Sequence, residues 1–349
     1  MYKKVGKRLL FGLFTVVLVA WWSIVVVGSF SAIMPDRVVL DNQTKYLDGA
    51  QMEYVTFVSQ AGTDCKALER HGILVKKPGA KATIVVCHGF MCNKFDISFM
   101  RRLIFPDYNV MIFDFRAHGE HVEAEHCCTF GRDEALDVAG AVNYLRARED
   151  LNGVPLIAYG FSMGAVAAIQ AQAASERQGN PFFKALILDC PYDTSENILK
   201  RCMDHLKFSF MGYTFDLPGK KFLERYAFNS YVQALLKSVL KTVAQLNATA
   251  TNTYIYPVNP AESIKSVTAP VFLIHCYNDE KVTVEAAHHL YDNAAGYKRL
   301  WITKGRRHFD SVFFIPDKYI YKVQLFIENV LSGAIQNKPC KKVLSDIKK

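Results

Sequence analysis

The stretch Ala158–Val166, AYGFSMGAV, places Ser162 between two glycines, Gly160 and Gly164. The apolar run PLIAYG before the serine predicts a buried strand, and MGAVAAIQAQAA after it predicts a helix. A sharp strand-to-helix turn needs glycine-sized residues two positions before and two positions after its tip, because side chains there would collide. The stretch therefore predicts a nucleophile elbow, with Ser162 exposed at the turn and a role as catalytic nucleophile.

Short apolar runs recur along the rest of the chain and alternate with helical patterns. The runs are ATIVVCHG (82–89), NVMIFDFR (109–116), ALILDC (185–190), VFLIHCY (271–277) and RLWIT (299–303). Helical patterns cover 131–150, a segment from about Val284, and about Tyr319 to Leu331. This alternation predicts an α/β fold with a mainly parallel central sheet and helices on both faces.

The same pattern suggests how the chain divides. Residues 36–53 read as a linker, and 54–335 as one catalytic domain. An insert at about 194–266 interrupts the rhythm and contains the aromatic stretch FSFMGYTF, so we expect a small helical cap. Residues 336–349 form a basic C-terminal tail.

An elbow serine needs a base and an acid, and chain order suggests which residues provide them. His308 follows the last predicted strand, at the place that a catalytic base occupies when the order is Ser, Asp or Glu, His. Asp279 lies in the loop after the preceding strand, where its carboxylate would orient the imidazole. Asp193, one strand earlier, is the alternative acid.

The oxyanion of such a reaction needs two backbone N–H groups. Met163, directly after the serine, is expected to supply one. Phe90, in the loop after the strand at 82–89, is expected to supply the other, with Gly89 permitting close approach. The neighbouring His88 is expected to order this loop by hydrogen bonding.

With these motifs in order, the chain from about Tyr54 to Leu331 resembles the α/β-hydrolase superfamily. The motifs are CHGF, FDFRAHGEH, GRDEALDVAGAVNYL, GFSMG, CYNDEKV and GRRHFDSVF. It is similar to the branch of dienelactone-hydrolase-like and prolyl-oligopeptidase-like serine hydrolases, which includes membrane-anchored members. The resemblance implies an α/β-hydrolase fold and acyl transfer through Ser162.

The resemblance does not specify a substrate; our first hypothesis is a small-molecule or lipid-like carboxylic ester or thioester with a fairly apolar acyl group. A serine peptidase or amidase with the same triad is one alternative, and a non-catalytic binding protein of this fold is another. No cofactor is expected. The sequence leaves the oligomeric state open.

The first 35 residues predict membrane attachment. Leu9–Pro35 contains no charged residue and is long enough for a membrane-spanning helix. A signal peptide cleaved near Ala32 is the alternative, but the apolar region of a signal peptide is usually shorter than this uncharged stretch. The basic residues before the span place the N-terminus in the cytoplasm and the catalytic domain in an extracytoplasmic compartment, periplasmic or luminal. They are Lys3, Lys4, Lys7 and Arg8.

Charge and cysteine content exclude two classes of partner. The net charge of +9 is dispersed, without zinc-finger spacing or a base-reading basic helix, so we expect no nucleic acid. None of the nine cysteines lies in a CxxC or Cys/His spacing, so we expect no metal. Cys87, Cys190 and Cys276 lie in or beside apolar runs and are expected to be buried thiols.

Overall fold

The structure is a computed structural model of the chain. It describes residues 50–335, apart from 63–66, 122–126, 206, 211–212, 217–224, 227, 235–252 and 255, together with a short segment at 343–345.

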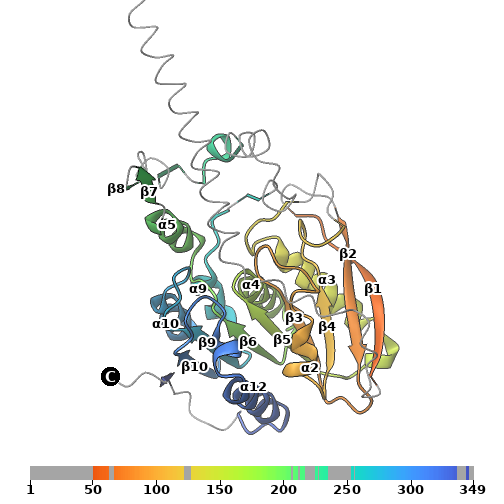
Figure 1. Ribbon diagram of the computed structural model, residues 1–349. Coiled ribbons are helices and arrows are strands. Elements are labelled where there is room, and N and C mark those ends of the chain that lie inside the picture. Colours follow the sequence, from red (N-terminus) through yellow and green to blue (C-terminus); the bar gives the residue numbers. More distant parts are fainter. Residues whose placement is uncertain are drawn as a thin grey trace, which may run out of the picture.

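A nine-stranded sheet forms the centre of the molecule (Figure 1), in the order β1-β2-β4-β3-β5-β6-β9-β10-β11. Strand β2 runs antiparallel to both of its neighbours, and all other adjacent pairs are parallel. The bounds are β1 Gln51–Ser59, β2 Leu68–Lys76, β3 Thr83–Cys87, β4 Asn109–Phe113, β5 Leu156–Phe161, β6 Ala185–Asp189, β9 Val271–Cys276, β10 Lys298–Thr303 and β11 Val343–Ser345. The predicted mainly parallel α/β sheet is therefore confirmed.

The five central strands β3, β4, β5, β6 and β9 are buried at every residue. This burial explains their continuous apolar runs, because a parallel strand covered by helices on both faces has no polar side.

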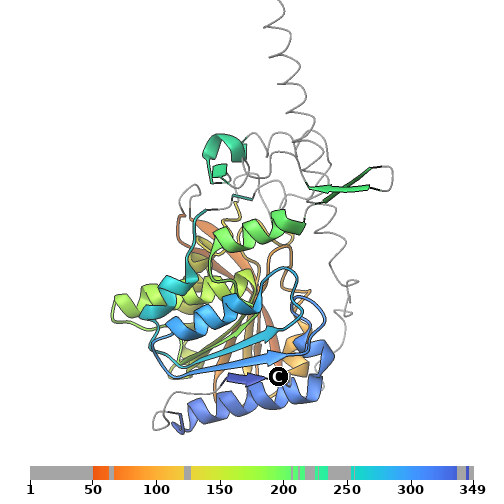
Figure 2. The same ribbon diagram turned by 90° about the vertical axis from the view of Figure 1, so that its left-hand side faces the viewer.

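Two helical layers cover the sheet (Figure 2). Helices α3 (Glu134–Arg146), α4 (Met163–Arg177) and α10 (Val284–Asn293) pack into the core on one face. Helices α2 (Phe99–Leu103), α11 (Ser311–Phe314) and α12 (Pro316–Leu331) contribute to the core on the other. The short helical turns are η1 (Glu149–Leu151), α9 (Pro260–Ser263) and η2 (Ile264–Ser266).

The insert between β6 and β9 is not purely helical, which corrects the expectation of a helical cap. It begins with α5 (Ser195–His205), which is followed by an antiparallel hairpin of β7 (Lys207–Phe210) and β8 (Tyr213–Asp216). The alternation of aromatic and polar residues in KFSF and YTFD has the period of a strand. The chain then returns to the main domain, where α9 and η2 pack against α4.

The two ends of this insert are joined by hydrogen bonds. The Ser195 amide donates to the Val258 carbonyl at 2.9 Å, and the Val258 amide donates to the Ser195 hydroxyl at 2.8 Å. The Ala261 amide donates to the Asp193 carbonyl at 3.1 Å. The insert therefore leaves and re-enters the domain at adjacent points.

The C-terminal tail contains a strand that the sequence pattern did not indicate. Strand β11 pairs in parallel with β10, where Trp301 is opposite Leu344. An exposed strand edge offers unpaired backbone groups to any neighbouring segment, so this pairing does not depend on a strong side-chain pattern.

The predicted anchor at 1–35 and most of the linker at 36–53 lie outside the described residues. Within the described part of the chain, every helix is too short or too polar to span a bilayer.

Candidate active site

Ser162 lies at the turn between β5 and α4, as the elbow motif requires. Its backbone has φ 50° and ψ −121°, in a region that residues other than glycine rarely adopt. The Ser162 amide donates to the Asp189 carbonyl at 2.9 Å, which ties the turn to the end of β6. The side chain is partly exposed. A conformation of this kind persists only where the surroundings hold it in place.

The two elbow glycines are required by close backbone contacts. A Cβ on Gly160 would lie 2.7 Å from the Ala165 backbone. A Cβ on Gly164 would overlap the carbonyl oxygens of Cys87 and His88. Gly164 therefore lets the first turn of α4 pack directly against the loop that follows β3.

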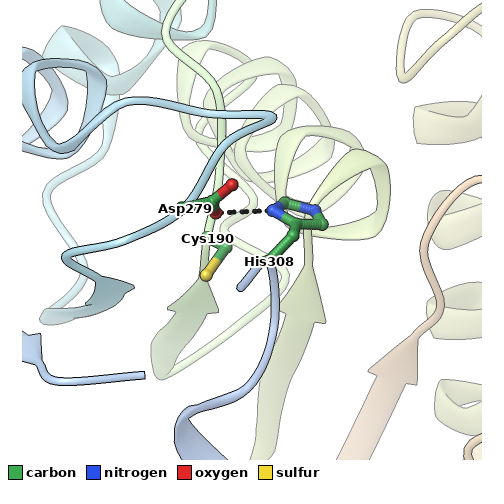
Figure 3. Close-up of side chains that lie close together, drawn as sticks. All are labelled: Cys190, Asp279 and His308. Carbon is green, nitrogen blue, oxygen red and sulfur yellow. Dashed lines mark hydrogen bonds and ion pairs between the residues drawn. The ribbon is translucent and has the colours of Figure 1, made fainter. Parts of the chain in front are cut away.

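The structure brings the predicted base and acid together (Figure 3). Nδ1 of His308 lies 2.6 Å from Oδ2 of Asp279. His308 is in the loop after β10, and Asp279 is in the loop after β9. With Nδ1–H donated to this carboxylate, the neutral imidazole carries its lone pair on Nε2, the atom that a general base uses.

The Asp279 carboxylate is buried and well supplied with donors. Its Oδ1 accepts hydrogen bonds from the amides of Lys281 and Val282, both at 2.9 Å. Burial raises the pKa of Asp279. The charge interaction and hydrogen bond with His308, together with the charge interaction with His275, outweigh burial and lower the pKa to about 2. The acid is therefore ionised throughout the pH range in which the protein would work.

Asp193, the alternative acid, points to a different histidine. Its Oδ2 lies 2.9 Å from Nδ1 of His289, on α10, and both of its carboxylate oxygens accept from the Asn197 side-chain amide. The geometry thus joins His308 to Asp279 and not to Asp193.

The two residues expected to form the oxyanion hole lie in adjacent segments. Met163 is the first residue of α4, so its amide is among the helix N-terminal N–H groups that have no acceptor within the helix. Phe90 lies in the loop after β3 and is partly buried.

His88 orders the loop that carries Phe90. The Phe115 amide donates to Nε2 of His88 at 3.0 Å, so Nδ1 carries the proton and donates to the Gly89 carbonyl at 2.7 Å. Burial lowers the pKa of His88 to about 4, which keeps the ring neutral.

The thiol of Cys190 is buried, as the sequence predicts, and lies beside the base and acid, a position that the sequence did not indicate. The Cys190 sulfur, a carboxylate oxygen of Asp279 and a ring nitrogen of His308 lie within 4.8 Å of one another (Figure 3). Burial raises the pKa of the Cys190 thiol well above its usual value. Nδ1 of His308 is hydrogen-bonded to Asp279. Cys190 is thus a buried thiol beside the hydrogen-bonded pair of His308 and Asp279.

A second carboxyl group, also missed from sequence, lies beneath the elbow. Oδ2 of Asp189 accepts a hydrogen bond from the Tyr319 hydroxyl at 2.7 Å, and the Tyr159 hydroxyl lies 2.6 Å from that of Tyr319. Within the described part of the chain, Oδ1 of Asp189 is buried without a hydrogen-bond partner. Burial raises the pKa of Asp189 to about 6. An apolar run ending in aspartate was the only signal in the sequence.

A cavity of about 400 Å³ lies between α5, the 281–283 segment and α10. It is next to the acid, because Val282 lines it and also donates its amide to Asp279. The lining residues are Tyr192, Asp193, Asn197, Ile198, Lys200, Arg201, Lys281, Val282, Thr283, Glu285, Ala286 and His289.

With this geometry established, comparison with known proteins identifies the family. A family model described as serine aminopeptidase, S33, matches residues 78–309, more than half of the chain. The chain belongs to this family. The S33 match contains Ser162, Asp279 and His308, and it confirms the expected α/β-hydrolase superfamily and a hydrolase function. Placement in the dienelactone-hydrolase-like branch stays a prediction.

This S33 protein is also similar to individual proteins. The uncharacterized protein YqkD of Bacillus subtilis (strain 168) is 27% identical over 285 residues, 80% of this chain and 81% of YqkD. Among solved structures, the Pyrococcus furiosus esterase Pf2001 superposes with a TM-score of 0.59 at 22% identity, covering 86% of this chain and all of that one. An acetyl xylan esterase from Paenibacillus sp. R4 gives a TM-score of 0.55 at 14% identity, covering 89% and 93%. At these identities the likeness is one of fold.

Proposed function

We propose that the protein is a serine hydrolase that cleaves a carboxylic ester or thioester through an acyl-enzyme on Ser162. The observation that carries this proposal is the 2.6 Å contact between His308 Nδ1 and Asp279 Oδ2, in a chain whose only G-x-S-x-G serine lies on a strained strand-to-helix turn. The esterases among the structural relatives favour ester over amide substrates.

In the proposed first step, Ser162 Oγ attacks the carbonyl carbon while His308 Nε2 accepts the hydroxyl proton. The Asp279 carboxylate holds the ring in the required tautomer and stabilises the imidazolium. The amides of Met163 and Phe90 bind the oxyanion. His308 then donates its proton to the leaving group, and water activated by the same histidine hydrolyses the acyl-enzyme.

We assign the cavity between α5 and α10 to the acyl group. Part of its lining is apolar, contributed by Tyr192, Ile198, Val282 and Ala286. The cavity adjoins the loop that carries the acid, because Val282 lines it and donates its amide to Asp279. The side chains of the aromatic residues at 208–215 of the insert lie outside the described part of the structure.

An aminopeptidase or amidase with the same residues is the second candidate, favoured by the description of the matching family. A fluorophosphonate probe tests for an activated serine, and parallel assays with p-nitrophenyl esters and aminoacyl p-nitroanilides separate the two candidates. Ester turnover at least about 100-fold above amide turnover in kcat/KM supports the first. The reverse ratio supports the second, and absence of both turnover and labelling supports a binding protein.

A further inference from the structure

The elbow and the histidine loop meet through two aromatic rings that the proposed mechanism does not use. Phe161 directly precedes Ser162, and Phe309 directly follows His308. Their ring centroids are 4.0 Å apart, with only 14° between the ring planes. A side-chain stack thus joins the neighbour of the proposed nucleophile to the neighbour of the proposed base.

Phe161 also contacts the loop that carries the proposed oxyanion donor. A Cβ built on Gly89 would lie 2.6 Å from Cε2 of Phe161 and 3.1 Å from its Cδ2, so the ring edge rests on the glycine backbone. Phe161 is 5% exposed, which leaves its ring little room to move. One buried ring therefore touches both the loop after β3 and the loop after β10.

Sheet topology explains why such a contact is needed. Strand β10, which leads to His308, is three positions from β5, which leads to Ser162. At the usual spacing between strands this is a separation of about 14 Å. Asp279 lies at the end of β9, the strand next to β10, so its hydrogen bond orients the imidazole but holds it on the β9 side. The contact between Phe309 and Phe161 extends the histidine loop to the elbow itself.

The backbone on both sides of the stack is in an unusual conformation. Ser162 has φ 50° and Phe309 has φ 57°, both in the left-handed region. Such conformations in residues other than glycine persist only where surrounding contacts maintain them. The stack also continues outward, because Phe313 contacts Phe309 edge to face at a centroid distance of 6.2 Å.

We infer that Phe161 and Phe309 are a pair of positioning residues, which together set the location of His308 relative to Ser162 and hold Gly89 in place. This inference rests on the proposed function of Ser162 and His308. Neither ring needs to contact the substrate, because the pair acts through the backbone of its catalytic neighbours.

The test is a double-mutant cycle with Phe161→Leu, Phe309→Leu and the double variant, measured on p-nitrophenyl butyrate. We expect each single variant to lower kcat about 10- to 100-fold, the range that a misplacement of about 1 Å causes, with KM changed less than about 3-fold. The double variant should be no slower than the slower single variant, because the loss of either ring already breaks the contact. Phe309→Tyr, which keeps the stack, should stay within about 3-fold of wild type.

Phe182→Leu is the matched control, because Phe182 is a partly buried ring in the segment after the C-terminal end of α4, whereas the elbow precedes the N-terminal end of that helix. It should leave kcat unchanged. The inference is overturned if the Leu variants keep kcat within 2-fold, if their losses multiply in the double variant, or if Phe309→Tyr is as slow as Phe309→Leu. It is also overturned if Phe182→Leu, at an equal loss of melting temperature, loses as much kcat.

Two further measurements separate this inference from the proposed function: the activity of the wild-type protein, and a double-mutant cycle of the same Leu variants on the free energy of unfolding. If the wild-type protein neither hydrolyses esters nor reacts with a fluorophosphonate, the proposed function fails and the positioning role fails with it. Coupled melting of the two Leu variants would then show only that the ring contact exists. If wild type is active and the kinetic cycle shows no coupling, the positioning role alone fails.

Discussion

Asp279 holds His308 with one carboxylate oxygen and is itself held through the other. Oδ2 lies 2.6 Å from the imidazole Nδ1, while Oδ1 accepts hydrogen bonds from the backbone amides of Lys281 and Val282. The acid cannot rotate without losing one of these sets of hydrogen bonds. The orientation of the imidazole is therefore fixed by the backbone of the loop after β9.

This arrangement predicts the effect of removing the acid's charge. Asp279→Asn should lower kcat by about 10⁴-fold, because an amide oriented by Lys281 and Val282 favours the wrong histidine tautomer. Asp193→Asn should change kcat less than about 5-fold, because that carboxylate pairs with His289. Steady-state kinetics on one ester measures both variants. A larger loss for Asp193→Asn would reassign the acid to the end of β6.

Replacement of the elbow serine should abolish the chemistry without loss of the fold. Ser162→Ala is expected to eliminate ester turnover and fluorophosphonate labelling, while circular dichroism and the melting temperature stay close to wild type. Ser332→Ala, at an exposed position after α12, is the control and should label normally. Labelling of Ser162→Ala at another serine would refute the assignment of the nucleophile.

The close approach of α4 to the β3 loop makes Gly164 intolerant of any side chain. Gly164→Ala should lower the free energy of unfolding by roughly 2–4 kcal/mol, because its Cβ overlaps two backbone carbonyl oxygens. Gly179→Ala is the control for the loss of any glycine. Gly179 has φ +70°, and a Cβ added there would have no other atom within 4 Å. We therefore expect backbone strain alone to lower the free energy of unfolding of this variant, by about 1–2 kcal/mol. Urea denaturation measures both. Equal losses would contradict the proposed backbone collision.

The buried carboxyl of Asp189 predicts a dependence of stability on pH. The folded protein keeps this proton up to about pH 6, whereas the unfolded chain releases it near pH 4. Between these values the folded state binds more protons than the unfolded chain. The free energy of unfolding therefore falls as pH rises, by roughly 3 kcal/mol in total.

Asp189→Asn should remove that contribution, so the variant should lose less stability than wild type between pH 4 and pH 7. Urea denaturation at these two values measures the difference. Asp317→Asn, an acid in the first turn of α12 that is exposed to solvent, is the control and should keep the wild-type slope. A wild-type slope in Asp189→Asn would show that this carboxyl does not titrate in the expected window.

Filling the cavity should change the preference for acyl length. Ile198 lies on α5 and lines the cavity, so Ile198→Trp should lower kcat/KM for p-nitrophenyl octanoate by about 10-fold or more and leave the acetate ester within about 2-fold. Glu196→Trp adds the same ring at an exposed position of the same helix and should change neither substrate. Equal losses for both esters in Ile198→Trp would place the acyl group elsewhere.

The fold and the proposed reactive groups could be predicted from sequence because they depend on local patterns and chain order. Buried parallel strands such as β5 and β9 are continuous apolar runs, and Ser162, Asp279 and His308 each lie in a loop directly after such a run. In this fold the carboxyl ends of parallel strands share one edge of the sheet, so order along the chain gives proximity in space.

Features that depend on contacts between distant segments could not be predicted in this way. The contact of Phe161 with Phe309 joins residues whose spacing has no motif, and Asp189 and Cys190 look like the ordinary end of a strand. The pairing of β11 with β10 uses backbone groups, so side-chain composition carries little trace of it. These features follow from strand order, which hydrophobic periodicity does not determine.

The hydrogen bonds between Ser195 and Val258 and between Asp193 and Ala261 have a consequence for how such a protein can diversify. Both ends of the insert are hydrogen-bonded to each other close to the ends of β6 and β9. A segment of different length or shape could therefore replace the insert without shifting these two strands. The part of the chain that covers the cavity can thus vary independently of the part that holds Ser162 and His308. Related enzymes could acquire new substrates by exchanging this one segment while the reaction itself stays the same.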